Sequence, residues 1–206
     1  VATMLRTTTI YAAACLTKDV TLWFNGAPLA VPNFRAFASV FAPAVPVVVA
    51  HDCVKGEGGM VLWDVAVVRA SAANTVKELG FVNSLEVSEG THMSLTASRI
   101  LAAVEEAMRS RFKRGADFSI TPSAVKKRLM VVVKLMVDSP EFSSQTKERL
   151  TTPATRFGFK WSPSAAFVRS LSDMGLLDEL WEEVQSKELA SARKTMAAST
   201  TSGGAS

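Results

Sequence analysis

The stretch LMVVVKLMVDSPEFSSQTKE, residues 129–148, decides the fold. Its first nine residues are apolar apart from Lys134 and rich in β-branched side chains, which favours a buried central strand. Pro140 ends this strand, and a serine-rich loop then presents Gln145, Thr146 and Lys147. Loops on a rigid scaffold often carry binding residues, and a lysine there suits a phosphate. The alternative is a solvated lysine in an exposed loop.

The composition is that of an ordinary globular protein, with 48% hydrophobic and 20% charged residues in 206. This length fits one domain, or one domain and a piece of another, and the start at Val1 leads us to expect part of a larger protein. No apolar run reaches the roughly 18 residues that span a bilayer. Cys15 and Cys53 form no disulfide framework, which favours a reducing compartment. A net charge of +4 is mild, so nucleic-acid binding would depend on local patches.

Helical and strand patterns alternate along the chain, which predicts an α/β fold. Asn25-Gly26 indicates a tight turn, Asn33 a helix cap, and Thr121-Pro122 a second helix start. We expect helices at 1–16, 33–41, from Ser94 to 112, from Thr121, from Ser162-Pro163 to Gly175, and after Gly175. Strands are expected at 20–24, 63–68, 80–87 and 129–137. The apolar run 42–50 also fits a buried strand, although its prolines favour a loop, and residues 197–206 read as a flexible linker.

A basic cluster lies between residues 107 and 128, where one acid, Asp117, stands against seven bases. Such a cluster can contact phosphates without reading sequence. Basic residues at a helix C-terminus also interact favourably with the helix dipole, so the cluster has a ligand-free explanation. The seven bases are Arg109, Arg111, Lys113, Arg114, Lys126, Lys127 and Arg128.

Three further segments offer only weak chemical signals. His92 is more typical of a loop or cap than of a catalytic base. His51-Asp52-Cys53 lacks the second ligand cluster that a structural zinc site needs. Residues 56–59 have the glycines but not the context of a phosphate-binding loop. We therefore expect no catalytic residue and no metal site in this chain.

Three ordered motifs carry a resemblance to a known family: Phe81–Ser84, Glu89–His92 and Ser144–Glu148. Together they resemble the transducer domain of eukaryotic-type DNA topoisomerase II. Residues 17–20 and 24–29 resemble the end of that family's GHKL ATPase domain. The resemblance covers roughly residues 5–190, and bacterial gyrase and mismatch-repair relatives share the layout.

The resemblance implies a ribosomal-S5-domain-2-like transducer domain, a mixed sheet backed by helices. The last helix and strand of a GHKL ATPase domain would precede it. It implies an ATPase remnant at 1–32, a connecting helix and loop at 33–60, the transducer domain at 61–196 and a linker at 197–206.

The same resemblance implies the site residues and partners. Gln145, Thr146 and Lys147 would reach a neighbouring ATP site, with Lys147 on the γ-phosphate. Double-stranded DNA would meet Arg111, Phe112, Lys113 and Arg114, although the spacing of Phe112 from Met108 is typical of core. Mg²⁺ would be held by parts of the enzyme outside this chain. The complete enzyme would be a homodimer without a membrane segment, in the nucleus or in an organelle that contains DNA.

The implied activity is the ATP-dependent passage of one duplex through a transient double-strand break in another. We expect this chain alone to be inactive, because the family's nucleotide-binding motifs and catalytic tyrosine would lie outside it. Tyr11, the one tyrosine, matches no nucleophile motif. Two alternatives stay open: a stand-alone basic S5-like nucleic-acid-binding module, and a small-molecule kinase of the same fold.

Overall fold

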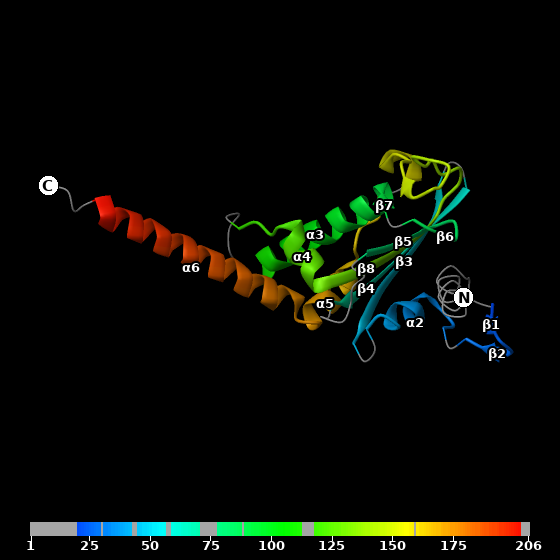
Figure 1. Ribbon diagram of the computed structural model, residues 1–206, viewed down its shortest axis with the longest axis horizontal. Helices are drawn as coiled ribbons and strands as arrows, with labels where there is room; N and C mark the ends of the chain where they lie inside the picture. The colour runs from blue at the N-terminus through cyan, green and yellow to red at the C-terminus, as the bar shows by residue number, and fades with distance from the viewer. Residues whose placement is uncertain are drawn as a thin grey trace.

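The computed structural model describes residues 20–29, 31–42, 45–56, 59–70, 78–87, 89–112, 118–158 and 160–202 (Figure 1). Its strands are β1 (Trp23–Phe24), β2 (Ala27–Pro28), β3 (Val47–Gly56), β4 (Gly59–Arg69), β5 (Glu78–Val82), β6 (Leu85–Glu86), β7 (Glu89–Gly90), β8 (Leu129–Met136) and β9 (Arg149–Leu150). Its helices are α2 (Phe34–Ser39), α3 (Thr91–Phe112), α4 (Pro122–Arg128), the 3₁₀ turn η1 (Ala154–Phe157), α5 (Ala165–Asp173) and α6 (Leu176–Ser202).

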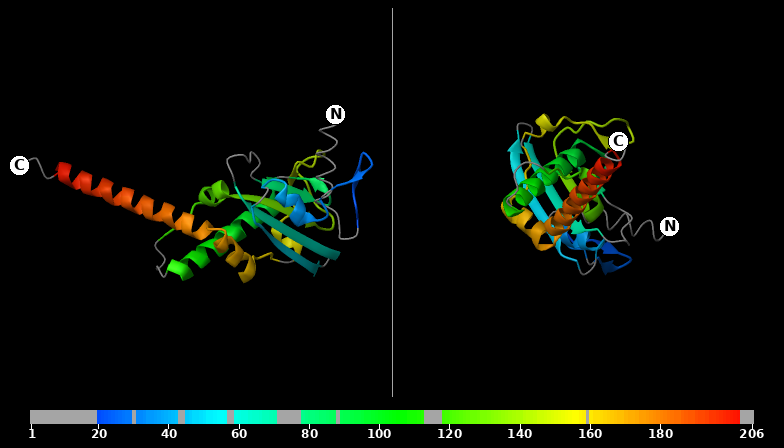
Figure 2. Two further views of the ribbon diagram at one scale, coloured as in Figure 1. Left: turned by 90° about the horizontal axis from the view of Figure 1, so that it is seen from below. Right: turned by 90° about the vertical axis from the view of Figure 1, so that its left-hand side faces the viewer.

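A five-stranded mixed sheet in the order β3-β4-β8-β5-β6 forms the centre of the molecule (Figure 2). β4 is antiparallel to both β3 and β8, whereas β5 runs parallel to β8. β8 is therefore the central strand that its β-branched sequence predicted. The pairing of the parallel strands β5 and β8 ends at Val82 and Leu135. The Gln-Thr-Lys segment follows from this end of β8.

Alternating side chains of β4 and β8 divide the core between the two faces of the sheet. Trp63, Val65 and Val133 point to the face that packs with α3, α5 and the start of α6. Ala66 and Val132 point to the opposite face, which Phe34 and Phe37 of α2 cover. The expected mixed sheet backed by helices is confirmed.

Lys134 is the one charged residue in the apolar run of β8, and it is buried. Its Nζ lies 3.1 Å from Oδ2 of Asp64 on the neighbouring strand, and His51 of β3 pairs with the same carboxylate. A buried charge is tolerated when it is paired, so Asp64 explains how a lysine occupies a central strand.

Several local predictions are confirmed. The side chain of Asn33 caps α2 by accepting from the amide of Ala36, and Thr121 caps α4 in the same way. Asn25 and Gly26 have φ of 50° and 79° and join β1 to β2 as a tight hairpin turn. The predicted helix at residues 1–16 lies outside the described residues.

Other predicted boundaries are wrong. Residues 80–87 form not one strand but the β5–β6 hairpin, because Asn83 and Ser84 both adopt positive φ. α3 starts at Thr91 rather than at a Ser94 cap, since His92 and Met93 are buried in its first turn. The cap of α5 is Ser164 rather than Ser162.

Two segments that were expected to be connecting loops or linkers form a strand and part of a helix. Residues 47–56, expected within a connecting helix and loop, form β3, in agreement with the apolar run. α6 continues to Ser202, so residues 197–202 are helical where a linker was expected. No glycine or proline interrupts the chain there, which lets the helix extend away from the body (Figure 1). Among the described helices, none is both long and apolar enough to cross a membrane.

Candidate functional site

The Gln-Thr-Lys triplet lies at the tip of a hairpin formed by residues 141–151, after β8. Phe142 bridges Leu150 in antiparallel fashion, and the amide of Ser143 donates to the carbonyl of Arg149 at 3.0 Å. At the base, the Glu141 amide donates to Thr152 Oγ1 at 2.8 Å. The tip residues 143–149 are exposed, whereas Leu150 is fully buried. The hairpin thus has an anchored base and a solvent-exposed tip.

Lys147 is presented by a tight turn within this tip. Its φ is 58°, and its amide donates to the carbonyl of Ser144 at 3.1 Å. Its Nζ lies 5.7 Å from the centre of the Phe142 ring. Lys147 itself is exposed, and a cation–ring contact at the surface is weak, so the ammonium group can exchange this contact for a phosphate.

The first motif, Phe81–Ser84, contacts the chain just before this hairpin. Asn83 Nδ2 donates to the carbonyl of Val137 at 2.8 Å, and the Val137 amide donates to Asn83 Oδ1 at 2.9 Å. The Asn83 amide itself donates to the carbonyl of Leu135 at 2.9 Å. The end of β8 is therefore tied to the β5–β6 turn.

The second motif, Glu89–His92, contacts the returning strand of the hairpin. β7 pairs in parallel with β9, so that Gly90 lies beside Leu150. A Cβ on Gly90 would lie 2.2 Å from the Leu150 carbonyl oxygen, and its φ is 125°. Only glycine allows this approach. The three sequence motifs, far apart in the chain, thus meet at one structural unit.

His92, the last residue of the second motif, is a structural histidine. It is fully buried, and its Nε2 donates to the carbonyl of Val87 at 2.8 Å. Burial lowers the pKa of His92 to about 4, against an opposing effect of the Val87 hydrogen bond. The ring is therefore neutral at physiological pH and unsuited to act as an exposed base.

A shallow depression of about 470 Å³ lies between this hairpin and β6–β7. Glu86, Glu89 and Glu148 line it together with Arg149 and Ser143. These carboxylates disfavour a phosphate in the depression, which leaves the exposed tip as the place where Lys147 could meet one. Within the described residues, no group of three His, Cys, Asp or Glu side chains is placed to hold a metal ion.

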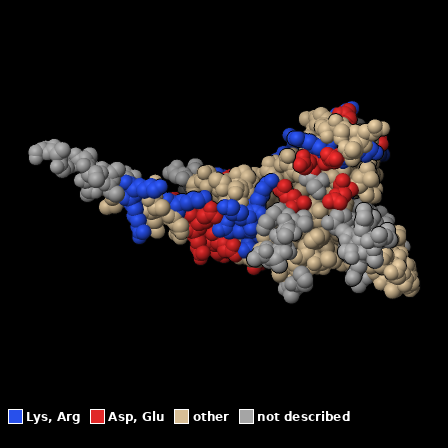
Figure 3. Space-filling model, viewed as in Figure 1, with Lys and Arg blue, Asp and Glu red and all other residues tan. Residues whose placement is uncertain are grey.

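The described members of the basic cluster are mostly engaged in ion pairs. Arg111 lies 2.7 Å from a carboxylate oxygen of Asp178 and donates to Ser172 Oγ at 2.7 Å. Lys126 pairs with Glu78 at 2.8 Å. Figure 3 shows basic and acidic side chains side by side along α6. Among the described members, Lys127 is exposed and shows no ion pair. Lys113 and Arg114 lie outside the described residues.

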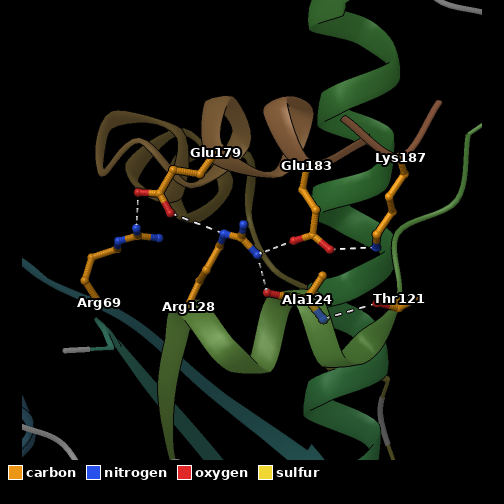
Figure 4. A network of polar contacts seen from close by, with 7 residues as sticks. All are labelled: Arg69, Thr121, Ala124, Arg128, Glu179, Glu183 and Lys187. Atoms are coloured by element: carbon orange, nitrogen blue, oxygen red, sulfur yellow. Dashed lines mark hydrogen bonds and ion pairs between the residues drawn. The ribbon is translucent and has the colours of Figure 1, made fainter. Parts of the chain in front are cut away.

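Arg128 joins α4 to the first turns of α6 (Figure 4). Its Nε lies 3.2 Å from Glu179 and its Nη1 lies 2.7 Å from Glu183. Arg69, at the end of β4, pairs with the same Glu179. Hydrogen bonds from Lys187, and then from Arg128, lower the pKa of Glu183. This network fixes the base of α6 and occupies a guanidinium group that would otherwise face solvent.

Phe112, a predicted DNA contact, packs on α6. Its ring stacks on Trp181 with centroids 4.6 Å apart, and Phe118 makes a T-shaped contact with the same indole at 5.9 Å. The helical spacing of Phe112 from Met108 had indicated this packing role. Both ends of the segment that carries Lys113 and Arg114 are thus anchored on one residue of α6.

Asn83, Phe142 and Trp181 were missed as contributors to these sites. A signal for Asn83 was present, because Asn-Ser favours a turn with positive φ within an apolar run. The signals for Phe142 and Trp181 were not, since their partners lie elsewhere in the sequence.

Comparisons with known proteins agree on one family. The family model for DNA gyrase B matches residues 39–201. The probable DNA topoisomerase 2 of Dictyostelium discoideum is 34% identical over 145 residues, which cover 69% of this chain and 9% of the relative. DNA topoisomerase 2-beta of Mus musculus is 27% identical over 194 residues, 91% of this chain and 11% of the relative. The chain spans about a tenth of these curated relatives.

Solved structures share the fold. The ATPase and transducer domains of Balamuthia mandrillaris DNA topoisomerase II align with a TM-score of 0.69 and 21% identity, over 89% of this chain and 44% of that one. The ATPase region of Saccharomyces cerevisiae topoisomerase II gives 0.67 and 20%, over 88% and 44%. The resemblance read from the three motifs is confirmed, and the chain belongs to the DNA gyrase B family.

Proposed function

We propose that this segment couples ATP binding and hydrolysis to movement in an ATP-dependent type II topoisomerase. Lys147 is the residue that carries the proposal. It is exposed at the tip of an anchored hairpin, and among the described residues its ammonium group contacts only the Phe142 ring. The family membership supplies the ATP dependence. Double-stranded DNA and a second copy of the complete enzyme are the proposed partners.

The chemistry of the tip fits a sensor of the γ-phosphate. ATP would bring the phosphate charge, and Lys147 would neutralise part of it as a flexible point charge, with Gln145 and Thr146 beside it as hydrogen-bonding groups. When the charge leaves, the interaction that holds the hairpin is lost. Because the hairpin base is tied to β5, β7 and β8, a change at the tip is transmitted to the sheet.

Replacement of Lys147 by alanine in the complete enzyme tests this function. We expect ATP-driven strand passage to fall at least about tenfold, because a charge contact in the reacting complex is lost. Folding should be unchanged, since the side chain is exposed. Relaxation of supercoiled DNA at saturating ATP measures the effect.

Lys160→Ala is the matched control, because Lys160 is also an exposed lysine outside the helices and strands. Lys147→Arg, which keeps the charge, should retain more activity than Lys147→Ala. Equal relaxation by Lys147→Ala and the parent enzyme would refute the sensor assignment and leave Lys147 as a solvated lysine in an exposed loop.

A further inference from the structure

Asn83 occupies the first central position of the two-residue β5–β6 turn. Asn83 and Ser84 have φ of 46° and 70°, as a turn of this kind requires. Glycine would satisfy the backbone equally well. The turn therefore favours Asn or Gly at this position, but it does not require the contacts that the Asn83 side chain makes.

The side-chain amide of Asn83 takes the place of backbone hydrogen bonds beyond the end of β5. β5 is paired with β8 up to Val82 and Leu135, after which the turn carries the chain away. Asn83 Nδ2 and Oδ1 then offer Val137 a donor and an acceptor, at 2.8 and 2.9 Å, which two backbone groups of a longer β5 would otherwise have offered. Both main-chain polar groups of Val137, which is 7% exposed, are satisfied by this one side chain.

Val137 follows the end of β8 and leads into the 141–151 hairpin, and its backbone is hydrogen-bonded to Asn83. Beyond it the chain passes through Ser139, with φ of 47°, and Pro140 to the hairpin base at Glu141. The opposite end of the hairpin is held independently, because Leu150 pairs with β7 and is fully buried. Asn83 thus fixes one of the two ends from which Lys147 is projected.

We propose that Asn83 is a positioning residue for Lys147: its side-chain amide holds the first strand of the hairpin, so that the lysine reaches the phosphate from a fixed base. This inference rests on the proposed function of Lys147. Asn83 contacts the backbone of Val137 and acts on the nucleotide only through the hairpin.

Hydrogen exchange on the 206-residue chain tests the two hydrogen bonds between Asn83 and Val137 without any nucleotide. Asn83→Gly keeps the turn and removes both bonds to Val137. The amides of Val137 and Ser143 should then exchange at least about tenfold faster, because local opening requires fewer hydrogen bonds to break. Ser84→Gly is the matched control, since it places glycine in the same turn and leaves the Asn83 amide intact. Equal exchange in the two variants overturns the inference.

Asn83→Asp provides a graded second variant. The carboxylate can still accept from the Val137 amide but cannot donate to the Val137 carbonyl. Exchange should lie between that of the parent and that of Asn83→Gly. If Asn83→Gly does not fold, this variant decides the question: parent-like exchange of the Ser143 amide in a folded Asn83→Asp protein overturns the proposal.

Steady-state ATP turnover by the complete enzyme separates positioning from mere stability. Asn83→Gly should lower kcat about tenfold while KM for ATP stays within about twofold. The rest of the ATP site is unchanged by this substitution, and only Lys147 is misplaced. In a Lys147→Ala background, Asn83→Gly should have no further effect. Asn83→Asp should restore part of kcat.

The outcomes distinguish the two proposals. A Lys147→Ala enzyme with parent-like turnover refutes the sensor function itself, whatever Asn83 does. A defective Lys147→Ala enzyme combined with a parent-like Asn83→Gly enzyme, or with effects of the two changes that multiply, overturns the role of Asn83 alone.

Discussion

His92 illustrates at the residue scale how a motif residue can be conspicuous and yet structural. It is one of two histidines in the sequence. Its Nε2 bonds to the Val87 carbonyl, and its Nδ1 finds no partner among the described residues. The ring therefore joins the start of α3 to the segment after β6. The sequence had indicated a loop or cap, and the fold places the side chain in the core.

The buried state of His92 predicts a pH dependence of folding. The pKa of His92 falls from 6.5 to about 4 on folding, so the unfolded chain binds more protons between these values. Folding is therefore not penalised by His92 above pH 6.5, and the stability of the folded chain decreases as the pH falls towards 4. The loss amounts to about 3 kcal/mol of unfolding free energy.

Denaturant unfolding at a series of pH values measures this effect. His92→Gln should flatten the change between pH 6.5 and 4, whereas His51→Gln, which removes the exposed histidine, should retain it. A slope that survives in His92→Gln would assign the pH dependence to other groups.

At the element scale, the pairing of β7 with β9 depends on one glycine. Gly90→Ala would place a Cβ 2.2 Å from the Leu150 carbonyl oxygen at a φ of 125°. We expect a loss of about 3 kcal/mol or more, since both backbone strain and a clash with main chain are introduced. Chemical denaturation with unchanged m-value measures the loss.

Gly175→Ala is the comparison for this element. Gly175 also has a positive φ, 78°, but nothing lies within 4 Å of its Cβ position. It should cost only about 1–2 kcal/mol, the penalty of the left-handed conformation. Equal losses of unfolding free energy at the two positions would mean that β7 and β9 can move apart to accommodate the Cβ at position 90 without losing stability.

At the scale of the whole molecule, the two candidate sites lie apart. The hairpin projects at one end of the sheet, while α6 leaves from the other and extends beyond the body (Figure 1). From Gln185 onward, the described side chains of α6 are exposed. Arg69, Arg111 and Arg128 hold its first turns to three different elements. A signal from the hairpin must therefore pass through the sheet to reach α6.

The predicted DNA contact can be tested against this supporting role. Charge reversal at Arg111, Lys113 and Arg114 in the complete enzyme should weaken DNA-stimulated ATP turnover. It should also lower the salt dependence, by about one unit of slope per lost phosphate contact. Stimulation measured over a salt series provides the result. Unaltered stimulation would refute the DNA contact and leave Arg111 with its ion pair to Asp178 alone.

Arg111 needs its own control, because it also pairs with Asp178. Arg111→Gln combined with Asp178→Asn removes the pair without leaving a lone charge. If Arg111 acts on DNA, the double variant stays impaired. If Arg111 only holds α6, the double variant recovers, and the contact falls to Lys113 and Arg114.

The sequence by itself determined the central strand, the caps of α2 and α4, and the family. These depend on local information: β-branched runs, capping side chains and three short motifs in a fixed order. It also predicted the exposed position of Lys147, since Pro140 and the serines preclude a continued strand.

Only the tertiary structure decided which residues support that lysine. Asn83 and Val137 are 54 residues apart in the chain, and Arg111 and Asp178 are 67 apart. Such pairs depend on strand register and helix packing, which no local pattern specifies. The basic cluster shows the consequence, because the same arginines that predicted a phosphate surface are partly neutralised once α6 folds against them.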